Sequence, residues 1–132
     1  KPRVAALAAV EVVNPDMPET VDAAALTKMC ERGQIKGCIV DGPLALDNAL
    51  SEEAAHHKGI VSEVAGRADV LLVPEIICGN MLYKAATFLA QGAVAGVVVG
   101  AKAPIVMTSR ADSSAAKLQS IALAVLAAQP QK

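Results

Sequence analysis

The sequence predicts a layered α/β/α domain built on a mostly parallel sheet of about five strands. Short strand-like segments alternate with helix-like segments along the 132 residues, with short loops between them. The strand-like segments are apolar throughout, as expected of strands that are covered on both faces. Hydrophobic residues make up 54% of the chain, yet Trp is absent and there is one Tyr and one Phe. The core must therefore be built from Ala, Val, Leu and Ile.

The first half of the chain predicts two strands and two helices. The apolar stretch Arg3–Val13 contains the first strand and its exit, and Gly37–Asp41 is a short buried second strand, Cys38-Ile39-Val40 at its centre, followed by a Gly-Pro turn. Thr20 is placed to cap a helix that Gly33 ends. Ser51 precedes two Glu residues and marks the start of the next helix, because acidic side chains favour the positive end of the helix dipole.

The second half predicts three more strands and two more helices. Val70–Val73 is a strand stopped by a proline, and apolar residues at helical spacing then predict a helix over Ile77–Phe88. Val94–Val99 and Ile105–Met107 are the last two strands. The connection between them is too short for a helical crossover, so they should pair antiparallel or lie at a sheet edge. Leu118–Leu126 marks a closing helix. No repeat or linker divides the chain, so we take residues 1–132 as a single α/β domain.

Composition excludes several classes of partner. Twelve basic residues against 13 acidic ones give a net charge of −1, and no basic stripe is present. Binding to nucleic acid or to an anionic membrane is therefore not expected, and the shortage of aromatics argues against stacking on bases. The longest uncharged run, Ala85–Ala101, is too short and too broken to span a membrane. No signal peptide is expected either. Because residue 1 is Lys and not Met, the chain could be a processed product or a piece of a longer protein.

The cysteines and histidines do not predict a metal site. Cys30, Cys38 and Cys78 are odd in number, widely spaced and form no C-x-x-C pair, which favours buried free thiols in a reducing cytoplasm. His56 and His57 are adjacent on a predicted helix, so their side chains diverge and are poor joint ligands.

The richest cluster of polar side chains is Thr108–Ser113, which follows the last predicted strand and opens the last helix. In open α/β sheets, ligands gather at the carboxyl ends of strands, and a helix N-terminus presents free N–H groups to anions. Arg110 could grip a phosphate through two parallel hydrogen bonds. The alternative is plain helix capping by Asp112 or Ser113, with Arg110 on the surface. The two interpretations are compatible.

Two weaker candidate sites lie elsewhere. Gly79 and Asn80 stand at the predicted start of a helix, where Gly would let a ligand approach the backbone and Asn80 would bond it; a simple turn into the helix is the alternative. Lys84, one turn on, reaches either the same cleft or solvent. Asp41-Gly42-Pro43 is interpreted as turn chemistry. No glycine pattern fits a phosphate loop or a dinucleotide fingerprint, which disfavours a dehydrogenase-like nucleotide domain.

Several stretches together resemble the phosphate acetyl/butyryltransferase family, and phosphate butyryltransferases most. The resemblance runs almost end to end and in order. Its motifs are DGPLALDNA (41–49), ADVLLVPE (68–75), GNMLYKA (79–85) and APIVMTSRADS (103–113). Family members are considerably longer, and this chain corresponds to their carboxy-terminal part. The fold that the resemblance implies is similar to that of isocitrate and isopropylmalate dehydrogenases.

The resemblance implies reversible transfer of a short, butyryl-like acyl group between coenzyme A and inorganic phosphate. Ser109 and Arg110 match the family's Ser-Arg pair, which implies hydrogen bonding to the acyl group by Ser109 and an electrostatic grip on substrate by Arg110. Asp112, Asn80, Gly79 and Lys84 are the expected substrate-binding residues. The acetyltransferases carry an Asp seven residues after the Ser as the thiol base, where this chain has Ala116, so that role does not carry over.

The expected partners are acyl-CoA and phosphate as substrates, with no covalently bound cofactor and no metal. We also expect a homo-oligomer. In the family the active site lies in a cleft between two domains, so this chain would carry half of it. The alternative is a ligand-binding or assembly domain with no activity of its own, because half a cleft cannot complete a transition-state site.

Overall fold

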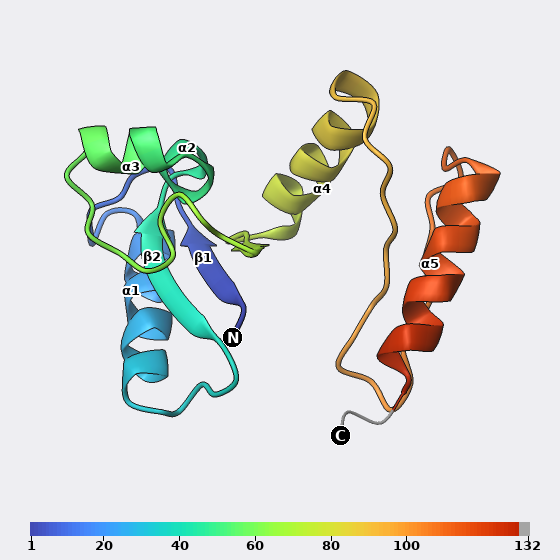
Figure 1. Ribbon diagram of the computed structural model, residues 1–132, viewed down its shortest axis with the longest axis horizontal. Coiled ribbons are helices and arrows are strands. Elements are labelled where there is room, and N and C mark those ends of the chain that lie inside the picture. Colours follow the sequence, from blue (N-terminus) through green and yellow to red (C-terminus); the bar gives the residue numbers. More distant parts are fainter. Residues whose placement is uncertain (130–132) are drawn as a thin grey trace. The chain divides into compact units, whose positions relative to one another are not determined.

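The computed structural model describes residues 1–129 and divides the chain into two compact units, Lys1–Cys78 and Gly79–Lys132. It confirms a mixed α/β chain with a parallel sheet, but the sheet has three strands and not five. Figure 1 shows the elements in chain order. They are β1 (Arg3–Leu7), α1 (Pro18–Glu31), β2 (Ile39–Leu44), α2 (Leu46–Leu50), α3 (Glu52–His57), β3 (Val70–Leu72), α4 (Ile76–Lys84), the π-helix η1 (Ala85–Leu89) and α5 (Ser114–Ala127).

The sheet of the first unit has the strand order β2-β1-β3, and both pairings are parallel. Val4 of the central strand β1 stands opposite Val40 of β2 and Val70 of β3. The sequence predicted all three strands, and β1 occupies the first five residues of the stretch that was expected to hold the strand and its exit. Parallel pairing of these strands is the expected consequence of the helices and loops that connect them.

The central strand is covered on both faces, as its continuous apolar character predicted. Ala5 and Leu7 belong to the core cluster, together with residues of α2, α3 and the segment that follows, among them Ala49 and Val64. Ala6 points to the opposite face, because successive side chains of a strand alternate, and α1 packs there against β1 and β2. The sheet therefore lies between α1 and the α2–α3 layer (Figure 1).

Gly42 and Pro43 were expected to form a turn, and this expectation is wrong. Both residues lie inside β2, and the register shifts there, because Ala5 pairs with Asp41 whereas Leu7 pairs with Leu44. The strand is at the sheet edge, where a bulge tolerates a proline. Gly42 also sits where a Cβ atom would come within 2.8 Å of the Ala6 Cβ and 3.2 Å of the Ala23 Cβ of α1. Only glycine permits this close approach of helix and sheet.

The helices α1 and α3 start differently, α1 with a proline and α3 with a capping serine. The first helix begins at Pro18 and not after Thr20, because proline is pre-organised for the first helical position. Thr20 is buried inside the helix, and its hydroxyl accepts a hydrogen bond from the Asn14 N–H (2.9 Å) and contacts the Met17 carbonyl oxygen (2.8 Å). The prediction for Ser51 is confirmed, since its side chain accepts from the Ala54 N–H at the start of α3.

The second unit contains η1, an extended segment and α5. The predicted strands 94–99 and 105–107 are reduced to one antiparallel bridge, in which Val98 and Ile105 exchange two backbone hydrogen bonds of 2.9 and 3.0 Å. Their antiparallel pairing is confirmed, but within the described part of this unit no third strand extends the bridge into a sheet. The predicted closing helix is confirmed as α5.

The three cysteines are free thiols but are not buried, so that part of the expectation is wrong. Cys30 and Cys38 are half-buried and Cys78 is exposed. Within residues 1–129, no three His, Cys, Asp or Glu side chains gather as a metal site would require. No helix in the same range has the length and apolar character needed to cross a membrane.

Candidate active site

The central feature of the second unit is the turn Ser109–Asp112, which leads into α5. The Asp112 carboxylate folds back and accepts a hydrogen bond from the Ser109 N–H at 2.7 Å, while the Asp112 N–H donates to the Ser109 carbonyl oxygen at 3.1 Å. Two reciprocal bonds thus fix the backbone conformation of the turn. Asp and Ser are the residue types that make such local side-chain-to-backbone bonds readily.

Tyr83, at the end of α4, holds the other oxygen of the same carboxylate. Its hydroxyl donates to Asp112 Oδ1 at 3.1 Å, whereas the Ser109 N–H occupies Oδ2. Burial of the phenol, and secondly the adjacent carboxylate, raise the pKa of Tyr83 above its ordinary value of 10.0, because both disfavour the phenolate. Tyr83 therefore remains a hydrogen-bond donor throughout the neutral range.

Lys84 brings a positive charge to the Ser109 hydroxyl. Its Nζ lies 3.4 Å from Ser109 Oγ, and 5.2 and 5.7 Å from the ring centroids of Tyr83 and Phe88. The two aromatic rings thus offer the ammonium group cation–π contacts that help to place it. Ser109 Oγ also accepts from the Ala111 N–H at 3.4 Å. Among the described residues no acceptor takes the hydrogen of this hydroxyl, so the geometry leaves it available as a donor.

Helix capping and anion binding were the two interpretations of this cluster, and the structure assigns capping to Ser113 while leaving Arg110 uninvolved in it. Ser113 is the N-cap of α5, and its side chain accepts from the Ala116 N–H at 3.1 Å. Arg110 is exposed and makes no hydrogen bond or ion pair within residues 1–129. Capping therefore does not occupy the guanidinium group of Arg110, which follows Ser109 in the turn.

Gly79 and Asn80 are not at a helix start, so this part of the prediction is wrong. The helix α4 begins at Ile76, and both residues lie inside it. Asn80 is exposed and stands three and four residues before Tyr83 and Lys84, so the three side chains share one helix face. The helical spacing of apolar residues from Ile77 placed the start of α4 within one residue, whereas the interpretation of Gly79 and Asn80 as a helix start placed it too late.

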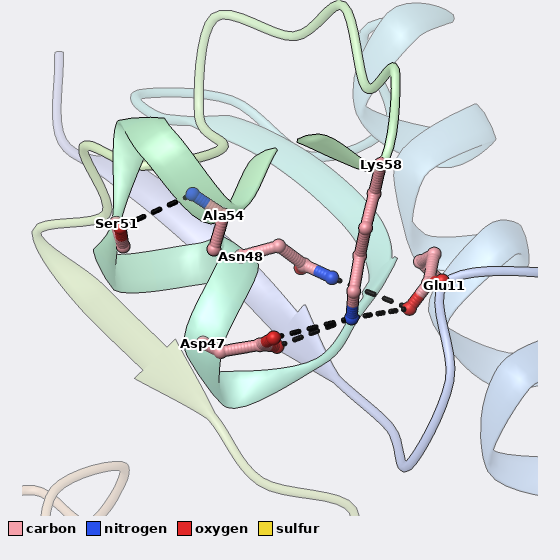
Figure 2. Close-up of polar contacts among 6 residues, drawn as sticks. All are labelled: Glu11, Asp47, Asn48, Ser51, Ala54 and Lys58. Carbon is pink, nitrogen blue, oxygen red and sulfur yellow. Dashed lines mark hydrogen bonds and ion pairs between the residues drawn. The ribbon is translucent and has the colours of Figure 1, made fainter. Parts of the chain in front are cut away.

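A second polar cluster, in the first unit, has a different character. Figure 2 shows Lys58 between Glu11 and Asp47, with Nζ 3.1 Å from Glu11 Oε2 and 3.2 Å from Asp47 Oδ2. Buried Asn48 donates to the same Glu11 oxygen at 3.3 Å. Hydrogen bonds from the Asn48 backbone and from Lys58 lower the pKa of Asp47. The cluster links the segment after β1 to α2 and to the end of α3. Its one cation, Lys58, is paired with carboxylates of the cluster itself.

The sequence matches a family model, that of phosphate acetyl/butaryl transferase, over residues 1–125. This match covers nearly the whole chain. The chain belongs to this family. It is 61% identical over 127 residues to the phosphate butyryltransferase of Clostridium acetobutylicum, and 59% identical over 125 residues to the phosphate acetyltransferase of Thermotoga maritima. Those alignments cover 96% and 95% of the chain but 42% of each relative.

Solved structures agree with the family assignment. A branched-chain phosphotransacylase from Enterococcus faecalis V583 matches with a TM-score of 0.82 and 43% identity, over 94% of this chain and 44% of that protein. A phosphotransacetylase from Staphylococcus aureus matches with a TM-score of 0.73 and 27% identity, over 94% and 39%. The present chain thus spans less than half the length of each of these relatives.

The structure brings together some of the predicted residues and adds one. Ser109, Asp112 and Lys84 are joined by hydrogen bonds, and Arg110 belongs to the same turn. Tyr83 is the addition, because no role was predicted for it beyond its place next to Lys84. The available signal was compositional: in a chain with no Trp and one Tyr, that tyrosine stands inside one of the motifs that resemble the family, GNMLYKA (79–85).

Proposed function

We propose that this chain supplies one side of the active-site cleft of a phosphate acyltransferase. The reaction transfers a short, butyryl-like acyl group between coenzyme A and inorganic phosphate. A phosphate oxygen bonds to the thioester carbonyl carbon, the C–S bond breaks, and acyl phosphate and the CoA thiolate result. The observation that supports this is the placement of Lys84 on the hydroxyl of Ser109, beside Arg110, in a chain that belongs to the family.

Arg110 and Lys84 are proposed to bind the anionic substrate. An exposed guanidinium group can hold phosphate through paired hydrogen bonds, and the N-terminal end of α5 adds a favourable field. Asn80, on the face of α4 that carries Lys84, and Gly79 next to it would complete the contacts with substrate. Family membership supports this assignment, because each position matches one of the family's motifs.

Ser109 is proposed to stabilise the developing oxyanion. Its oxygen already accepts from Lys84 and from the Ala111 N–H, so its hydrogen can be donated to the carbonyl oxygen as negative charge forms there. A donor that is fixed before the reaction costs no reorganisation in the transition state, which is the basis of oxyanion stabilisation.

Asp112 is proposed to position the turn on the substrate side of the cleft and not to act as a base. Both carboxylate oxygens accept hydrogen bonds, from the Tyr83 hydroxyl and from the Ser109 N–H. A carboxylate engaged in this way is a poor base for the CoA thiol. Ala116 has no ionisable side chain, so neither residue supplies that base.

The experiment uses a chimera, made from the Clostridium acetobutylicum phosphate butyryltransferase by replacing its 127-residue aligned stretch with this chain's own residues. We expect the chimera to form butyryl phosphate from butyryl-CoA and phosphate. Arg110→Ala should lower kcat/KM about 100-fold, a typical loss for one catalytic electrostatic contact. Lys117→Ala, which removes an exposed positive charge on α5, is the matched control and should leave kcat/KM near the parent value. Unchanged kcat/KM in Arg110→Ala would remove this residue from the site.

The partial span of the chain supports a second test on the isolated 132 residues. Because half a cleft cannot complete the transition-state site, we expect no phosphate-dependent release of CoA from butyryl-CoA. Activity would contradict the half-site proposal. An inactive chimera that still binds phosphate would favour the alternative, a non-catalytic ligand-binding or assembly domain.

We further propose that the protein is cytoplasmic and works as a homo-oligomer with acyl-CoA and phosphate as its partners. The free state of all three cysteines supports a reducing compartment. Sedimentation of the chimera would measure the oligomeric state, and a purely monomeric active species would contradict that part of the proposal.

A further inference from the structure

A cavity of about 230 Å³ lies in the second unit, between the π-helix η1 and the first turn of α5. Seven of its 11 lining residues are apolar or glycine, among them Phe88 of η1, Val94 of the extended segment and Ala116 of α5. Asp112 and Ser113 also line it. The cavity is therefore adjacent to the turn that holds Ser109. Single π-helical turns are rare and occur frequently at functional sites.

The polar groups of the lining are mostly satisfied within the protein. Both Asp112 oxygens accept hydrogen bonds, and Ser113 Oγ accepts from the Ala116 N–H. The hydroxyl of Thr87, a third polar lining residue, donates to the Tyr83 carbonyl oxygen at 2.8 Å. Gln119 is the remaining one. An occupant would thus gain by burying apolar surface and not by new hydrogen bonds, which favours an alkyl group.

We propose that this cavity receives the alkyl chain of the acyl substrate, and that Ala116 is a residue that sets its permitted length. The inference rests on the proposed function. Two lining residues bond directly to Ser109: Asp112 accepts from its N–H, and the Ala111 N–H donates to its hydroxyl oxygen. The alkyl chain of a substrate whose carbonyl group meets that hydroxyl is therefore proposed to enter this cavity. An apolar cavity of about 150 Å³ is known to hold a six-carbon ring, so the volume of about 230 Å³ accommodates a four-carbon chain.

The first test measures chain-length preference in the chimera. Ala116→Leu places three more carbons in the cavity, and Ala122→Leu makes the same change at an exposed position of α5 that does not line it. We expect Ala116→Leu to lower kcat/KM for butyryl-CoA about 10–100-fold relative to acetyl-CoA, because one or two methylene groups are worth about that much discrimination in an apolar pocket. Ala122→Leu should leave the ratio of the two substrates unchanged. Equal loss on both substrates in Ala116→Leu, with the fold intact by circular dichroism, would overturn the proposal.

The second test does not depend on catalysis. The 132-residue chain is titrated with butyramide and with acetamide, and backbone amide shifts are followed by NMR. We expect saturable shifts at Val94 and Ala116 with butyramide, much weaker ones with acetamide, and loss of the butyramide response in Ala116→Leu but not in Ala122→Leu. Absence of a saturable response to butyramide would overturn the cavity's role whatever the chimera does. A chimera inactive on both acyl-CoA substrates would instead contradict the proposed function, so the two failures are distinguishable.

Discussion

The two units of the chain hold polar clusters that differ in what they do with their charges. In the first unit, Lys58 is paired with Glu11 and Asp47, so its charge is neutralised where it stands. In the second, Lys84 reaches a neutral hydroxyl and Arg110 is exposed without an ion pair among the described residues. The first arrangement stabilises the fold, whereas the second leaves positive charge unpaired within the described residues, as the proposed binding of an anionic substrate requires. The two clusters therefore differ in whether their cations are paired, and this difference supports the proposed site.

Removing one hydroxyl from each unit gives the largest expected contrast. Ser109→Ala should lower kcat of the chimera about 100–1000-fold, because the donor to the developing oxyanion is lost, and should leave the urea midpoint nearly unchanged. Ser51→Ala removes the cap of α3 and should cost about 1 kcal/mol of unfolding free energy with little effect on kcat. Equal kcat for Ser109→Ala and the parent would show that the Ser109 hydroxyl has no role in the reaction.

The next largest difference is expected in unfolding free energy, when a glycine of each unit is replaced by alanine. Gly42→Ala forces a Cβ to within 2.6 Å of the Ala6 carbonyl oxygen, so we expect a loss of about 1–3 kcal/mol of unfolding free energy. At Gly96 of the second unit the nearest atom would be 3.7 Å away, and the same change there should be close to neutral. Urea denaturation of both variants measures the difference. A neutral Gly42→Ala would show that α1 is not pressed against the sheet as described.

The link between Tyr83 and Asp112 predicts a smaller effect, visible in the absorbance of the chain's one tyrosine. Tyr83 should titrate above pH 10, and Asp112→Asn should bring its pKa part of the way back, because the carboxylate is the secondary cause and burial the larger one. Since the raised pKa favours the neutral phenol in the fold, its contribution to stability is complete below pH 10 and is lost as pH rises above that. A Tyr83 pKa that Asp112→Asn leaves unchanged would contradict the hydrogen bond.

The smallest expected effect concerns an exposed ion pair of the first unit. The Arg3 guanidinium bonds both oxygens of Asp69 at 2.9 Å and lowers the pKa of that carboxyl group. Its stabilisation is therefore complete above the ordinary Asp pKa of about 4 and disappears as pH falls below it. The difference in unfolding free energy between the parent and Arg3→Met should be constant from pH 5 to 8 and shrink in acid. A difference that does not change with pH would rule out this pair as its source.

Apolar runs in the sequence predicted the first unit well because each strand there has a partner within the chain. Val4, Val40 and Val70 meet in one sheet, and continuous apolar character correctly indicated a doubly covered strand. The same reasoning predicted too much strand in the second unit. Among the described residues, Val98 and Ile105 form an isolated bridge, because strand propensity forms a sheet only where further strands are available to pair.

The candidate site was predictable in its residue types and less so in its geometry. Hydroxyls, Arg and Asp before a helix indicated an anion site, and Lys84 was named from its spacing. The bond from Tyr83 to Asp112 joins residues 29 positions apart, and no local pattern encodes such a contact. Ser51 marked the start of α3 correctly, and Ser113, one of two candidate caps, is the N-cap of α5. Thr20 does not cap α1, and the interpretation of Gly79 and Asn80 as a helix start placed α4 too late.

The position of β1 also has a consequence for how the first unit folds. The central strand comes first in the chain, and both of its neighbours come much later; Arg3 and Asp69, which join its start to the segment before β3, are 66 residues apart. The sheet therefore consists of non-local contacts, which fold slowly because long loops must close first. During synthesis, β1 can pair with β3 only after Leu72 has emerged from the ribosome, so the sheet cannot be completed while its central strand is being made.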